Sequence, residues 1–218
     1  MRPLRLTSVF FLMVAALSLF AGTASADSVT MKLTGVGGNN AGGVYTYPYN
    51  FSIDGRANVA LICDDYNNEV TVGETWRANV VGLLSGKGLF GNSNQARLDY
   101  KAAGLIFEGI LSGKVSVNAG NFAIWGLFSS AAQQNSYFQS SGAANIDSIY
   151  LAMAKTTPAS AFKGLVLYTP IAGSQSSGGL PQEYIGYGTA PEPGSLALFG
   201  TGLISLAGII RRKKLSKA

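Results

Sequence analysis

The sequence predicts an α+β fold, with a β-rich N-terminal half, short helices in the middle, C-terminal strands and then one short transmembrane helix. Two patterns predict this class. Within residues 27–91, apolar residues alternate over 29–33 and 45–53, and within residues 92–155 they recur with a helical period. A third observation is size: of 218 residues, 47% are hydrophobic, which is enough for one domain with a substantial core.

The strands are expected where side chains alternate or form short apolar runs. The first half holds four such stretches and the end of the domain two more. They are 29–33, 45–53, 59–63, 76–84, 162–169 and 183–187. The stretch 59–63 is apolar throughout, which is typical of a strand that is buried on both faces. A glycine-rich segment, residues 35–43, is expected to be a turn or loop.

Three helices are expected in the middle of the chain. The first runs through 98–109, where apolar residues share one face; Ser93 is placed to cap it and Gly113 to end it. A second is expected over 121–130 and is apolar nearly all round, so it should be buried. A third is expected over 145–154, before Pro158.

The net charge of +5 is confined to the two ends of the chain. Residues 27–190 carry nine basic and ten acidic side chains, so we expect no nucleic-acid partner. The chain has no histidine and one cysteine, which excludes histidine-based triads, intrachain disulfides and multi-cysteine metal sites. No cofactor is expected.

Residues 1–26 have the organisation of a signal peptide. Arg2 and Arg5 precede an apolar run over 6–19, and Ala24 and Ala26 supply the small residues that signal peptidase requires. We expect cleavage after Ala26. The alternative is an uncleaved anchor, although the apolar run is shorter than the roughly 20 residues that span a bilayer.

The carboxyl end has three parts. A spacer, 186–194, contains Pro191, Glu192 and Pro193, whose prolines favour an extended, accessible chain. An apolar run, 195–210, is expected to be a short transmembrane helix. The basic tail, 211–218, begins with Arg211, Arg212, Lys213 and Lys214, which should stay in the cytoplasm and leave the domain 27–185 outside.

This end resembles the PEP-CTERM sorting signal of exported bacterial proteins, because the tripeptide, the apolar run and the basic cluster follow in that order. The resemblance implies an exosortase that removes the anchor near Pro191–Pro193. It also implies a Gram-negative envelope, a membrane-anchored state before processing, and later association with extracellular polysaccharide. The alternative is a plain tail anchor with an accidental tripeptide.

The densest polar segment follows the apolar stretch 59–63. Asp65, Asn67 and Glu69 have the first three ligand spacings of a calcium loop, but Val70 and Trp76 stand at the positions that need Gly and Glu. The interpretation that we favour is a solvated strand end with Asx turns. Carboxylates such as Asp65 and Glu108 leave open a secreted glycan hydrolase.

Cys63 gives a second resemblance. Ile62–Tyr66, the helix containing Ala102–Ile106, and Asn121–Trp125 follow one another in the order found in thioester-forming adhesin domains. Asn121 stands where those domains have a glutamine. The resemblance implies a related fold and a cysteine–amide pairing, whereas the residue type alone favours a small buried side chain.

The aromatic residues leave a binding alternative open. Tyr45, Tyr47, Tyr49 and Trp76 could stack on sugar rings if they shared an exposed sheet face, although half-buried sheet positions are more usual. The sequence therefore predicts an exported envelope or matrix protein, non-enzymatic and associated with exopolysaccharide or biofilm. The alternatives are a thioester-like adhesin and a glycan-active enzyme.

Overall fold

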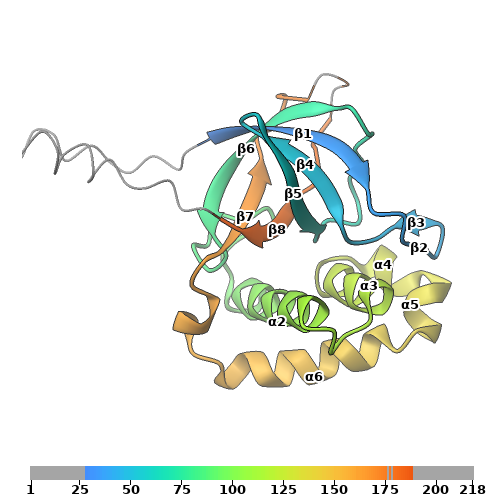
Figure 1. Cartoon of the computed structure of the whole chain (residues 1–218). Coiled ribbons are helices and arrows are strands. Elements are labelled where there is room, and N and C mark those ends of the chain that lie inside the picture. Colours follow the sequence, from blue (N-terminus) through green and yellow to red (C-terminus); the bar gives the residue numbers. More distant parts are fainter. Residues whose placement is uncertain (1–27, 176, 178, 189–218) are drawn as a thin grey trace, which may run out of the picture.

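The structure, a computed structural model, describes residues 28–188 except 176 and 178. Six strands close into an antiparallel barrel, and the helices gather on one side of it (Figure 1). The order around the barrel is β1-β4-β5-β8-β7-β6. The strands are β1 (Ser28–Val36), β4 (Tyr49–Ile53), β5 (Arg56–Cys63), β6 (Thr75–Gly82), β7 (Leu165–Pro170) and β8 (Tyr184–Tyr187).

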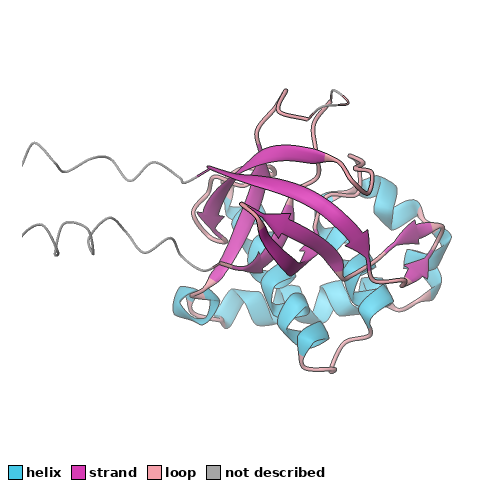
Figure 2. Ribbon diagram, turned by 45° about the horizontal axis from the view of Figure 1, so that its top comes forward, coloured by secondary structure: helices cyan, strands magenta, loops and turns pink. Residues whose placement is uncertain are grey.

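The helical layer lies between β6 and β7 in the chain. Its elements are α2 (Asn94–Leu111), α3 (Val117–Phe128), α4 (Ser130–Gln134), α5 (Ser136–Ser140), α6 (Ala143–Thr156) and the 3₁₀ helix η1 (Ala159–Phe162). Figure 2 shows this layer behind the barrel. A small hairpin, β2 (Asn40–Ala41) and β3 (Val44–Tyr45), stands apart from the barrel. The β-rich first part and the helical middle confirm the α+β prediction.

Aromatic side chains fill the interior of the barrel. The Phe51 ring lies edge-on to Trp76 and Tyr184, with centroid distances of 5.8 and 4.7 Å. Tyr49 meets Tyr184 in the same way, at 5.5 Å. Pairs of this geometry contribute about 1 kcal/mol each beyond their area of burial. The interior is therefore a packed core, and Trp76, at 1% exposed, cannot stack on a sugar.

The longest helix, α2, begins and ends where the sequence predicts. The Ser93 hydroxyl accepts a hydrogen bond from the amide of Ala96 at 3.0 Å, which caps the first turn. Gly113 follows the helix with a positive φ of 72°, a conformation that glycine adopts at no steric cost. Gly104 lets α2 approach the barrel, since a Cβ there would lie 2.7 Å from Leu83.

Two of the expected strands need correction. The stretch 45–53 is not one strand: β3 ends at Tyr45 and β4 begins at Tyr49, because Thr46 and Tyr47 are held by hydrogen bonds to α3. Residues 159–162 form η1, so β7 begins only at Leu165. The strand expected over 183–187 is confirmed by β8. The short helices α4 and α5 and the closure of the barrel were not predicted.

Within the described residues, no helix is both long enough and apolar enough to cross a bilayer. The transmembrane helix expected at 195–210 lies outside those residues, as do the signal peptide and the basic tail.

Candidate functional site

The polar residues singled out in the sequence meet where the end of β5 reaches the helical layer. We call Cys63, Asp64, Asp65, Asn121 and Glu183 the junction cluster. Each of the five side chains is at most 1% exposed. Cys63 is the last residue of β5, and Asp64 and Asp65 follow it directly. Glu183 directly precedes β8, and α3 supplies Asn121. A burial this complete closes the cluster to any substrate while the barrel and the helices stay together.

Asn121 joins three segments. Its Nδ2 donates to the carbonyl oxygen of Cys63 at 3.0 Å, and its Oδ1 accepts from the amide of Tyr47 at 2.8 Å. Because a carbonyl only accepts and an amide N–H only donates, these two partners fix the orientation of the side-chain amide. The structure thus brings together Cys63 and Asn121, which the sequence pairs only through a resemblance.

The Cys63 thiol is a buried, protonated group. It is a free thiol and donates to the carbonyl oxygen of Asp65 at 3.2 Å. Burial raises the pKa of Cys63 well above its ordinary value, and the charges of Asp64 and Asp65 raise it further. Since the thiolate is the nucleophilic form, these surroundings do not activate the sulfur.

Asp65 forms the expected Asx turn, but in the interior. Its Oδ1 accepts from the amides of Asn67 and Asn68, at 3.1 and 3.3 Å, and its Oδ2 accepts from Asn68 Nδ2 at 2.6 Å. The prediction of a solvated strand end is therefore wrong for Asp64 and Asp65, because the helical layer covers them.

The calcium spacing does not become a ligand set in the structure. Asn67 Oδ1 accepts from the Ser129 hydroxyl at 2.8 Å, Glu69 is exposed, and Asp65 is engaged in its turn. Among the described residues, no three His, Cys, Asp or Glu side chains are grouped so that they could hold a metal ion. Glu108 lies on α2, where it accepts from the Tyr187 hydroxyl.

Sequence reasoning missed the carboxyl pair formed by Asp64 and Glu183. Glu183 accepts from the Tyr100 hydroxyl at 2.6 Å, from the Leu89 amide at 2.8 Å, and from the hydroxyl of Thr169. These donors suit an ionised Glu183. No local pattern could have found the pair, because its partners come from distant parts of the chain.

Asp64 and Glu183 form a buried pair of carboxyl groups. Burial is the largest cause that raises the pKa of Asp64, and the charge of Glu183 adds to it. Burial also raises the pKa of Glu183, while its hydrogen bonds oppose the rise. Neither oxygen of Asp64 has a donor in the described structure. Burial and the charge of Glu183 therefore both favour a protonated Asp64.

The three tyrosines of the sugar-stacking alternative do not share an exposed face. Tyr45 is 51% exposed, Tyr47 is half-buried with its ring 5.7 Å from that of Phe107, and Tyr49 is buried in the barrel. Tyr45 is thus the most exposed of the three, and Tyr49 is closed to a ligand.

The remaining predicted site residues lie outside the described part of the chain. They are Ala24 and Ala26 at the signal cleavage site, Pro191, Glu192 and Pro193 in the sorting motif, and Arg211, Arg212, Lys213 and Lys214 in the tail. The last described strand, β8, ends at Tyr187, shortly before the motif.

The comparisons with known proteins bear on this end of the chain. Residues 189–214 match the family model of the PEP-CTERM protein-sorting motif. No match was found among curated proteins or among solved structures. The chain therefore carries a PEP-CTERM sorting motif, which supports an exported protein that an exosortase sorts.

Proposed function

We propose that this chain is a cell-envelope or extracellular-matrix protein, non-enzymatic and associated with exopolysaccharide or biofilm. It is anchored in the inner membrane through residues 195–210, released by an exosortase near Pro191–Pro193, and then held at the cell surface or in the matrix. The observation that carries the proposal is the motif match at residues 189–214.

The chemistry of the junction cluster supports a non-enzymatic role. The one thiol is buried and protonated, and the Asp64–Glu183 pair is enclosed. General acid–base and nucleophilic catalysis both need a group that reaches the substrate. Neither group in the junction cluster meets that need.

Processing at the motif can be tested with Pro191→Ala/Pro193→Ala in the native host. The double variant should keep its C-terminal peptide, detected by mass spectrometry, and stay in the membrane fraction. The matched control is Pro181→Ala, outside the motif, which should be processed like the wild type. Normal processing of the double variant would contradict exosortase sorting.

Association with polysaccharide can be tested by co-sedimentation with exopolysaccharide from the host strain. We expect Tyr45→Ala to weaken sedimentation, because Tyr45 presents an exposed aromatic ring. Ile149→Ala is the control, since Ile149 is a similarly exposed apolar residue on α6. Release of reducing ends from the same polysaccharide would instead favour the glycan-active enzyme.

A second candidate is a surface adhesin with a thioester-like domain. One observation favours it: the Asn121 amide lies against Cys63, at 3.0 Å from its carbonyl oxygen. A thioester would form when the Cys63 sulfur replaces the amide nitrogen of Asn121, releasing one ammonia. Mass spectrometry of the secreted protein tests this. A mass lower by one ammonia, with trapping by methylamine, supports the adhesin; an intact mass with a free thiol rejects it.

A further inference from the structure

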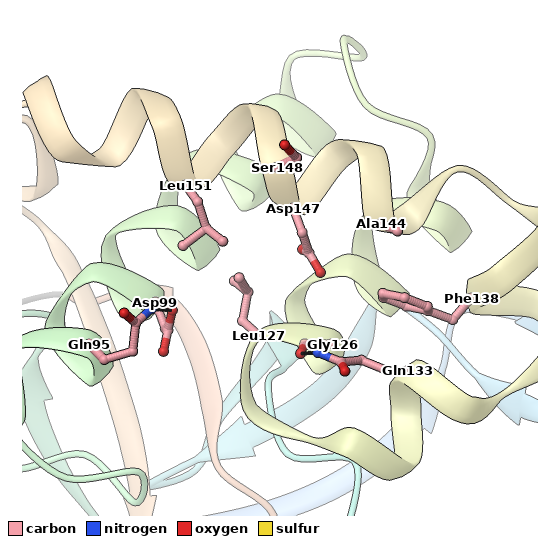
Figure 3. Close-up of a pocket in the computed structure, with 10 residues that line it drawn as sticks. All are labelled: Gln95, Asp99, Gly126, Leu127, Gln133, Phe138, Ala144, Asp147, Ser148 and Leu151. Atoms are coloured by element: carbon pink, nitrogen blue, oxygen red, sulfur yellow. Dashed lines mark hydrogen bonds between the residues drawn. The ribbon is translucent and has the colours of Figure 1, made fainter.

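A second polar site lies inside the helical layer, away from the junction cluster. It is a cavity of about 620 Å³, within the range of small-molecule sites. All five α-helices of the layer contribute to its wall (Figure 3). Asp99 and Gln95 line it from α2, and Asp147 reaches from α6 toward the middle of the cavity.

The polar wall consists mainly of hydrogen-bond acceptors. Gln95 Nε2 donates to Asp99 Oδ1 at 2.7 Å, and Gln133 Nε2 donates to the carbonyl oxygen of Gly126 at 2.7 Å. Because both partners only accept, each glutamine must present its NH₂ group to them and keep its oxygen as a further acceptor. When the two carboxyl groups are ionised, they and the two amide oxygens can accept hydrogen bonds from a ligand that carries donors.

Asp147 is the least satisfied of these groups. It is 8% exposed, and its Oδ1 is buried without a hydrogen-bond partner in the described structure. Among the described residues that line the cavity, none is Lys or Arg. An uncompensated buried carboxylate is costly, so a cation in the cavity would stabilise it.

The charged groups of the packed helices do not supply that cation. Asp99, on α2, adds a like charge. Lys101, also on α2, donates instead to the carbonyl oxygens of Ala154 and Thr157 at the far end of α6. Lys155 of α6 is exposed. Burial, with the charge of Asp99, raises the pKa of Asp147 to about 8.

The size and the walls of the cavity favour an organic cation over a metal ion. The volume far exceeds that of one ion, and no group of three ligating side chains is found in the described residues. Leu127 and Leu151 offer apolar surface for an aliphatic body, and the ring of Phe138 can face a cation.

We propose that this cavity binds a primary amine, with its ammonium group held between Asp99 and Asp147 and its body against Leu127, Leu151 and Phe138. The amine can come from a free aliphatic amine or from an amino sugar, since both present the same ammonium donor. The proposal stands independently of sorting by an exosortase.

The test is calorimetric titration of the full chain, in an uncharged detergent, with putrescine, glucosamine and glucose. At least one of the two amines should bind, and glucose should not. If only putrescine binds, the ligand class is an aliphatic amine. If glucosamine binds, the ligand class includes amino sugars. Absence of binding by both amines, or equal binding of glucose and glucosamine, would overturn the proposal.

Variants of the two carboxyls locate the site. Asp147→Asn and Asp99→Asn should each weaken amine binding about tenfold or more, because each removes a charge-assisted hydrogen bond. Glu69→Gln removes an equal charge from an exposed residue and should leave binding unchanged. Circular dichroism shows which variants fold; if Asp147→Asn does not, Asp99→Asn decides. Wild-type affinity in a folded carboxyl variant refutes the site.

The pH gives an independent readout. From about pH 6 to about pH 9, putrescine affinity should rise about tenfold or more, because Asp147 ionises in this range while an aliphatic ammonium, with a pKa near 10, stays charged. The rise should vanish in Asp147→Asn. A rise of the same size in that variant would contradict the role given to Asp147.

Discussion

Replacing Asp147 with asparagine should stabilise the protein, and increasingly so as the pH rises. The carboxyl has its pKa raised from its ordinary value of 3.8 to about 8 by burial and by the charge of Asp99. The folded state therefore holds a proton that the unfolded chain releases. Folding stability from this group is fully present below about pH 4 and is lost as the pH rises toward about pH 8.

The loss in the free energy of unfolding depends on how much of this pH range is crossed. Between the two pKa values, each pH unit lowers the free energy of unfolding by about 1.4 kcal/mol. The step from about pH 5 to about pH 7 therefore lowers it by at most about 2.7 kcal/mol. Asp147 borders a cavity, where solvent screens part of its charge, and we expect about half of that figure. Asparagine keeps the shape of the side chain and does not titrate, so it should remove this loss.

The assay is urea unfolding of the wild type, Asp147→Asn and the control Glu69→Gln across this pH range, without added amine. The difference in the free energy of unfolding between Asp147→Asn and the wild type should grow by about 1 kcal/mol or more from about pH 5 to about pH 7. Glu69→Gln should show no such growth. A difference that stays constant with pH would refute a protonated Asp147 in the folded state.

Three further substitutions test single contacts of the fold by urea unfolding. Asn121→Ala should cost about 3 kcal/mol, because it leaves the Tyr47 amide and the Cys63 carbonyl without partners; a loss below about 0.5 kcal/mol would argue against the bridge. Ser93→Ala should cost about 1 kcal/mol by removing the cap of α2, and unchanged stability would mean that water replaces it. Gly126→Ala should cost about 2 kcal/mol, since its Cβ would lie 2.3 Å from the Phe138 ring; a neutral result would show that the ring can move.

The sequence predicts those parts of the fold that depend on local pattern. α2 begins at Ser93 and ends before Gly113 because a cap and a left-handed glycine act on their own neighbours. The apolar run 59–63 predicts a strand there, and β5 includes it, but only Leu61, Ile62 and Cys63 are buried and Ala60 is exposed. Closure of the barrel does not, because it depends on pairing β1 with β6, which are far apart in the chain.

The same distinction applies to the candidate sites. Cys63 and Asn121 stand 58 residues apart, and only the order of their motifs indicates that they meet. No sequence pattern near Glu183 predicts that it lies beside Asp64. Likewise, Asp99 and Asp147 face one cavity only because α2 packs against α6. The burial of Asp64 and Asp65 reverses the solvated strand end that their polarity predicts, since the helices that cover them come later in the chain.

The central claim is that an exosortase sorts this protein through the motif at residues 189–214. The most direct measurement is the size and location of the protein in the native host and in a strain that lacks the exosortase. We predict a shortened protein at the cell surface or in the matrix of the native host. In the deletion strain, the protein should stay in the membrane fraction and keep its C-terminal residues. Identical processing and location in the two strains would contradict the claim.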